Sequence, residues 1–107
     1  MDHAQKADIS LARHVEVGGA LRYLTQQLGC DNWYVACHHE HLFVFRLTFG
    51  STDKFAVRME CNAPVEKGVY HGCKAWSLAI TPLHHEPVLS LEQIKNLERG
   101  LSGLSQC

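Results

Sequence analysis

The chain has 107 residues, a formal net charge of −1 and 46% hydrophobic residues, which excludes a disordered chain and predicts a single domain over residues 1–107. The near-zero charge excludes binding to nucleic acid or an anionic membrane through overall charge. Because no apolar run approaches the ~18 residues of a transmembrane helix and the first residues lack an apolar signal core, we expect a cytoplasmic protein with no membrane partner.

The first predicted element is a helix that ends at Gly29. Its apolar residues, Val17, Leu21, Leu24 and Leu28, recur at helical spacing, and glycine often follows the last turn of a helix. Gly18-Gly19 weakens a helix interior. Residues 8–17 therefore either extend this helix or form a separate turn or short helix before it.

Four antiparallel strands are predicted next, near 33–38, 41–49, 54–61 and 70–80, where β-branched and aromatic residues alternate with turn signals. We expect a two-residue turn at His39-Glu40 and a three-residue turn over 50–52. This register directs one set of side chains to the core: Tyr34, Ala36, Phe43, Phe45, Leu47, Phe49, Phe55, Val57, Met59, Trp76, Leu78 and Ile80.

A closing helix follows, with Ser90 as its N-cap and Gln93 completing a capping box. The apolar face of this helix consists of Leu91, Ile94, Leu97 and Leu101. The sequence thus predicts an α+β fold of order α-β-β-β-β-α, in which a four-stranded antiparallel sheet carries the N- and C-terminal helices on one face. An alternative is that the first strand, or the segment at 8–17, pairs elsewhere.

The opposite face of the predicted sheet mixes apolar and basic side chains, and such a surface usually contacts something. We predict that it binds a partner, either a second copy in a homodimer or another protein. The alternative is that the segment before Val17 folds over it. The predicted partner-binding residues are Trp33, Val35, Leu42, Val44, Arg46 and Arg58.

Nucleic acid is a weaker alternative for the same face. Arg46, Lys54 and Arg58 could contact phosphates while Trp33 stacks on a base. Glu60 interrupts this basic patch, however, and the sequence contains no RNA-binding consensus. We therefore do not expect nucleic acid as the partner.

Histidine and cysteine are the residue types that suggest a metal. The five cysteines are odd in number and include no C-x-x-C pair, and the chain has eight histidines. The predicted register places His38, His41 and Cys61 in a row, which is a ligand set for zinc with one open position. His84 and His85 fall too far from this row to join it. We expect no cofactor, with zinc at this row as the alternative.

Motifs for catalysis are missing from the sequence. A Cys61–His41 pair lacks an orienting third residue, and no glycine motif for phosphate binding is found. We therefore predict a small, non-catalytic protein-interaction or self-associating module that uses the non-core sheet face. The alternatives are a metal-dependent binding protein or hydrolase at the His/Cys cluster, and a weak nucleic-acid-binding module.

Overall fold

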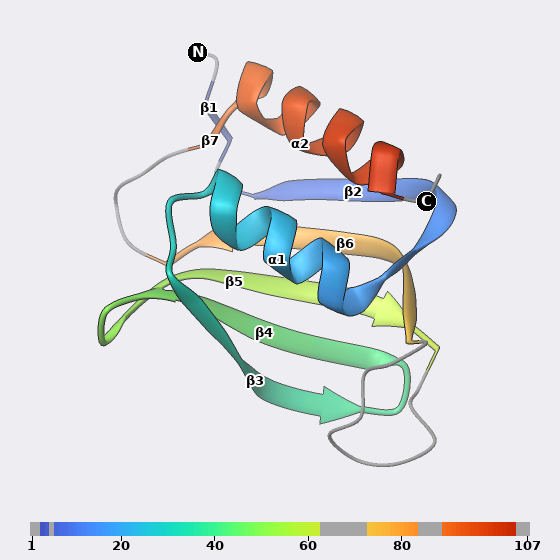
Figure 1. Cartoon of the computed structure of the whole chain (residues 1–107), viewed down its shortest axis with the longest axis horizontal. Coiled ribbons are helices and arrows are strands. Elements are labelled where there is room, and N and C mark those ends of the chain that lie inside the picture. Colours follow the sequence, from blue (N-terminus) through green and yellow to red (C-terminus); the bar gives the residue numbers. More distant parts are fainter. Residues whose placement is uncertain (1–2, 5, 63–72, 84–88, 105–107) are drawn as a thin grey trace.

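The computed structural model describes residues 3–4, 6–62, 73–83 and 89–104 (Figure 1). Its strands and helices follow one another along these residues as β1 (His3–Ala4), β2 (Ala7–Glu16), α1 (Val17–Gln27), β3 (Asn32–His39), β4 (Leu42–Phe49), β5 (Thr52–Cys61), β6 (Lys74–Pro82), β7 (Leu89–Ser90) and α2 (Leu91–Leu104).

The main sheet has five antiparallel strands in the order β2-β6-β5-β4-β3, and β1 pairs with β7 in a separate short ladder. The predicted fold of a four-stranded sheet in the order α-β-β-β-β-α is therefore wrong. Both helices lie on the same side of the main sheet, as Figure 1 shows. The other side of the sheet carries neither helix, and we call it the uncovered face.

The segment before the first helix is the main reason for this correction. Ala7 and Ile9 are buried while Asp8 and Ser10 are exposed, a period of two that belongs to a strand with one buried face. This segment pairs with β6 as an edge strand, with a register shift between Ser10 and Val15. It neither extends the helix nor folds over the uncovered face.

Helix α1 agrees with its predicted pattern. Val17, Leu21 and Leu24 are fully buried, and Gly29 has a φ of 71° just beyond the helix. This left-handed backbone favours glycine because a Cβ would crowd the following carbonyl. Neither α1 nor α2, the helices in the described part of the chain, is long and apolar enough to cross a membrane.

The register between β3 and β4 differs from the predicted one. Glu40 and His41 form the turn, and Glu40 has a φ of 53°. The shift in the ladder between Val35 and Cys37 leaves Ala36 as an extra residue. Because a β-bulge reverses the alternation of side chains beyond it, the first half of β3 presents its other residues to the core.

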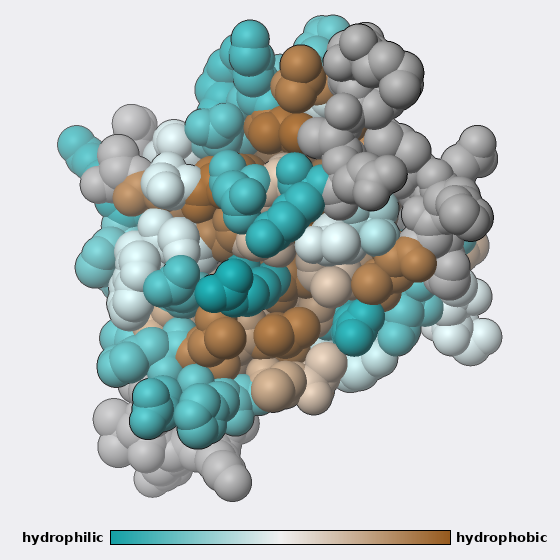
Figure 2. Space-filling model, turned by 180° about the vertical axis from the view of Figure 1, so that it is seen from behind, coloured by the Kyte–Doolittle hydropathy of each residue, from teal (hydrophilic) through white to brown (hydrophobic). Residues whose placement is uncertain are grey.

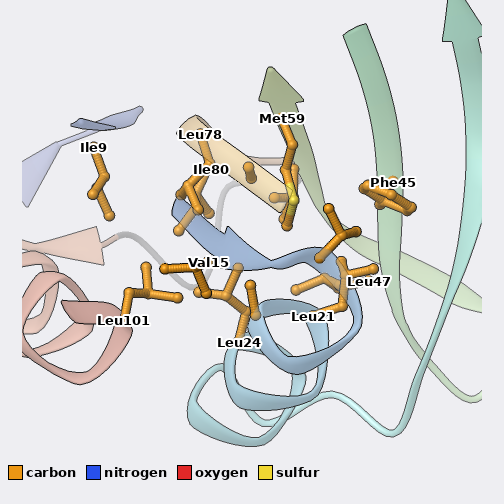
Figure 3. Packing of buried hydrophobic residues seen from close by; sticks show 14 of the residues in the cluster. Ile9, Val15, Leu21, Leu24, Phe45, Leu47, Met59, Leu78, Ile80 and Leu101 are labelled. Carbon is orange, nitrogen blue, oxygen red and sulfur yellow. The ribbon is translucent and has the colours of Figure 1, made fainter. Parts of the chain in front are cut away.

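The core joins both helices to one face of the sheet. Figure 3 shows Leu21, Leu24 and Leu101 from the helices packed against side chains from the strands. Most strand residues assigned to the core are buried there, but Tyr34, Ala36 and Phe49 are exposed and Trp76 is half-buried. The correctly assigned core residues of the strands are Phe43, Phe45, Leu47, Phe55, Val57, Met59, Leu78 and Ile80.

Candidate functional site

The uncovered face is the largest surface of the sheet that no described element covers. Figure 2 shows hydrophobic side chains gathered on this side of the molecule with hydrophilic side chains between them. Strand pairing aligns the face in three rows across the sheet: His39, Leu42, Glu60, Ser77 and Ser10; then Cys37, Val44, Arg58, Ala79 and Asp8; then Tyr34, Arg46, Ala56 and Thr81.

Four of the six predicted partner-binding residues lie together on the uncovered face. Leu42 and Val44 are half-buried neighbours on β4, and Val44 lies opposite Arg58 on β5. Arg46 lies opposite Ala56, one row away. Side chains on one face at such diagonal positions are about 7–8 Å apart, so both guanidinium groups can contact one partner.

The placement of Trp33 and Val35 on this face is wrong. Trp33 pairs with Leu47 and Val35 with Phe45, which directs both toward the helices. The Trp33 ring meets the edge of Phe45, with 5.8 Å between ring centroids. The bulge at Ala36 is the cause, because it exchanges the two faces of β3 for the residues before it.

Tyr34 takes the place on the uncovered face that the predicted register gave to Trp33 and Val35. Its side chain is 45% exposed, and its hydroxyl donates a hydrogen bond of 2.7 Å to Asp53 Oδ2. This hydrogen bond to a carboxylate favours the protonated phenol and raises the pKa of Tyr34. Tyr34 is therefore a neutral, oriented aromatic side chain at the β3 margin of the face.

The two arginines of the face have no partner in the described part of the chain. Neither Arg46, which is half-buried, nor Arg58, which is exposed, makes an ion pair or hydrogen bond with another described residue. A guanidinium group offers five N–H donors and favours carboxylates. No described residue therefore pairs with these two donor groups, and they are suited to an additional acidic group, although Arg46 also acts electrostatically on Tyr34 opposite it.

A hollow of about 170 Å³ opens on the same face beside Arg58. It lies over β6, where the small side chains of Ser77 and Ala79 are flanked by larger ones from β5 and β2. The Ser77 hydroxyl donates to Glu60 Oε1 at 3.2 Å. The lining residues are Asp8, Ile9, Ser10, Arg58, Glu60, Ser77, Leu78 and Ala79. This hollow has room for one side chain of a partner.

Strand β2 contributes Asp8 and Ser10 to this face, and the residues predicted for the face did not include them. The signal that could have found it is the alternation of Ala7 and Ile9 with these two polar residues. The sequence leaves open whether residues 8–17 extend the helix, form a separate turn or short helix, or pair elsewhere, and the pairing of β2 with β6 agrees with the last of these.

The predicted metal ligands have other contacts. His38 stacks on Phe43, with ring centroids 3.9 Å apart, and it does not face His41. His41 does lie beside Cys61, but its Nδ1 is 3.2 Å from the Cys61 carbonyl oxygen. No group of three or more His, Cys, Asp or Glu side chains arranged for a metal is found among the described residues. His84 and His85 lie outside those residues, and zinc at the predicted row stays a prediction.

The Cys61 thiol is held in its neutral form. It is fully buried and shares a hydrogen bond with Cys73, whose Sγ also lies 2.8 Å from the Asn62 carbonyl oxygen. Burial is the main cause that raises the pKa of Cys61 to about 12, because a buried thiolate loses hydration. At neutral pH this thiol is therefore a poor nucleophile.

Comparison with known proteins gives no relative: no protein-family model, no curated protein and no solved structure matches this chain.

Proposed function

We propose that the protein is a non-catalytic protein-interaction module whose uncovered face binds a segment of another protein that carries carboxylates beside aliphatic side chains. The guanidinium groups of Arg46 and Arg58, which no described residue pairs with, are the observation that carries this proposal. Leu42 and Val44 supply the adjacent apolar contact. Arginine and apolar side chains together are the usual centre of a protein interface.

The charges of the face favour protein over nucleic acid as the partner. Glu60 lies two residues from Arg58 on β5, and Asp8 lies in the same row as Arg58. These carboxylates repel a continuous phosphate backbone, whereas a protein segment can present one acidic group to the arginines and a different side chain to the hollow.

Cytoplasmic location is part of the same proposal. The contacting thiols of Cys61 and Cys73 are free in the structure. Neighbouring thiols persist where the compartment is reducing, which supports the cytoplasm.

Selection from a random peptide library displayed on phage tests the proposal with a defined probe. We expect the enriched peptides to contain Asp or Glu beside aliphatic residues. Their affinity should fall at least ~10-fold for Arg46→Glu/Arg58→Glu, because each lost charge-assisted hydrogen bond costs about 1.5–3 kcal/mol. Arg22→Glu, at an exposed position on α1, is the matched control and should bind like wild type.

Three outcomes would contradict this function. One is a selection that enriches no peptide over the Arg46→Glu/Arg58→Glu variant, and another is enriched peptides that bind both proteins equally. The third is tighter binding of a single-stranded RNA oligonucleotide than of any selected peptide. Circular dichroism and the melting temperature show whether each variant is folded.

A further inference from the structure

The two edges of the main sheet are protected to different degrees. At one edge, β2 carries the exposed charges of Asp8, Arg13 and Glu16, and its ladder with β6 is interrupted between Ser10 and Val15. Helix α2 runs beside this strand in Figure 1. Charges, bulges and a covering helix are the features that stop an edge strand from pairing with another chain.

The opposite edge, β3, has almost none of these features. Its eight residues, Asn32–His39, include no Lys, Arg, Asp, Glu or Pro. No other strand in the described part of the chain pairs with its outer side. The bulge at Ala36 interrupts its regular pairing, and before the bulge the Trp33 N–H donates a hydrogen bond of 2.9 Å to the Asn32 side-chain oxygen, which an added strand would displace.

Side chains on both faces of β3 are also incompletely covered. Trp33 and Val35 pack against the hydrophobic core but remain half-buried at its margin. Tyr34 is 45% exposed on the opposite face. A strand added alongside β3 would therefore bury apolar surface on both sides of the sheet in addition to making backbone hydrogen bonds.

We propose that the occupant of this edge is a second copy of the chain, whose β3 pairs antiparallel with the first across a two-fold axis. An uncharged strand pairs with itself without charge repulsion, and a two-fold axis supplies the same donors and acceptors from both copies. The two main sheets then form one continuous sheet with both uncovered faces on the same side.

The alternation of side chains limits the register, and we place its centre at Tyr34. Directly opposite residues must share a face, and in the regular stretch Trp33 and Val35 point to the helix side while Tyr34 points to the uncovered side. Pairing centred on Tyr34 satisfies this condition, because it places Trp33 opposite Val35 of the second copy and Tyr34 opposite its own counterpart. Centring on Val35 instead sets Trp33 opposite Cys37, which lies on the other face beyond the bulge.

Sedimentation equilibrium across the micromolar range tests the association. We expect wild type to be a dimer and Tyr34→Lys to be at least ~10-fold weaker, because it places two ammonium groups opposite each other. Gln26→Lys, exposed on α1, adds the same charge away from the edge and should remain a dimer. Amides of residues 32–36 should exchange with solvent more slowly as wild type is concentrated.

Engineered disulfides test the register without relying on a destabilising change. The background protein has serine in place of the exposed Cys37, the half-buried Cys30 and Cys107. In this background Tyr34→Cys should form a disulfide-linked dimer under oxidised glutathione, because the Cβ atoms of directly opposite residues lie about 4.5–5.5 Å apart. Thr81→Cys, on the same face but on β6, should stay unlinked.

A monomeric wild type throughout this range would overturn the proposal, as would equal linking of Tyr34→Cys and Thr81→Cys. Loss of the dimer in Arg46→Glu/Arg58→Glu with retention in Tyr34→Lys would show that copies meet through their faces, which contradicts the edge pairing. Peptide binding by a wild type that stays monomeric would leave the proposed function intact, so the two proposals can fail separately.

Discussion

Gly100 allows the two helices to approach each other closely. A Cβ built at this position would overlap the hydroxyl and ring carbons of Tyr23 on α1. The Tyr23 hydroxyl lies 3.4 Å from the Asn96 carbonyl oxygen one turn earlier on α2. The glycine therefore lowers the helix propensity of α2 but permits a close contact between α2 and α1.

We expect Gly100→Ala to lower the free energy of unfolding by about 1–2 kcal/mol, because the overlap with Tyr23 outweighs the ~1 kcal/mol gain in helix propensity. Gly103→Ala is the matched control on the same helix. A Cβ there meets nothing within 4 Å, so this change should stabilise by about 0.5–1 kcal/mol. Urea unfolding measures both.

The Tyr23→Ala background provides the second arm of this experiment. Without the tyrosine ring, Gly100→Ala should stabilise the protein as Gly103→Ala does. Equal stabilisation by both changes in the wild-type background would show that Tyr23 moves aside at no cost and that the close contact is unimportant.

At the scale of elements, helix α2 begins where its capping residue predicts. The Ser90 hydroxyl accepts a hydrogen bond of 3.1 Å from the Gln93 backbone N–H, which confirms Ser90 as the N-cap. Local chemistry decides this boundary, because a serine side chain can satisfy an N–H group that the helix itself leaves unpaired.

Ser90→Ala should therefore lower the free energy of unfolding by about 1 kcal/mol, whereas Ser90→Asp should retain most of the stability because its carboxylate accepts the same bond. Chemical denaturation at neutral pH compares the three proteins. An alanine variant as stable as wild type would show that the hydrogen bond to Gln93 adds nothing to α2.

Strand boundaries were more predictable than strand faces. The four predicted strands were located from β-branched and aromatic runs, and the sheet contains them as β3, β4, β5 and β6. The faces of β3 were assigned wrongly because one extra residue, Ala36, reverses every side chain before it. Such a bulge depends on packing across strands, which alternation within one strand does not record.

At the scale of the whole molecule, helix α2 is an integral part of the core. Leu101 is fully buried beside Val15 (Figure 3), whereas Leu91 at the other end of the helix is 50% exposed. The two ends of one helix thus offer the same residue type in opposite environments.

Leu101→Ala should lower the free energy of unfolding by about 2–5 kcal/mol, since it removes buried methyl groups and leaves a cavity. Leu91→Ala should cost less than about 1 kcal/mol, because an exposed side chain loses little burial. Thermal and urea unfolding measure both, and similar losses for the two variants would contradict the placement of α2.

The candidate site was predictable only in part. Leu42, Val44, Arg46 and Arg58 were found because β4 and β5 pair through most of their length in the expected register. For the row of His38, His41 and Cys61, at which zinc stays a prediction, the displaced turn sets His38 opposite Phe43, and the Cys61 thiol contacts Cys73. Side-chain contacts across strands decided both outcomes.

The sequence by itself determined the helices, the positions of strands β3 to β6 and most of the buried face, because hydrophobic periodicity and capping residues are local properties. The near-neutral composition also excluded partners that bind through overall charge. Only the tertiary structure decided that residues 7–16 form an edge strand, that β3 reverses its faces and that one edge is left unprotected. These features depend on which strands are neighbours, and strand pairing is set by long-range contacts that no local pattern contains.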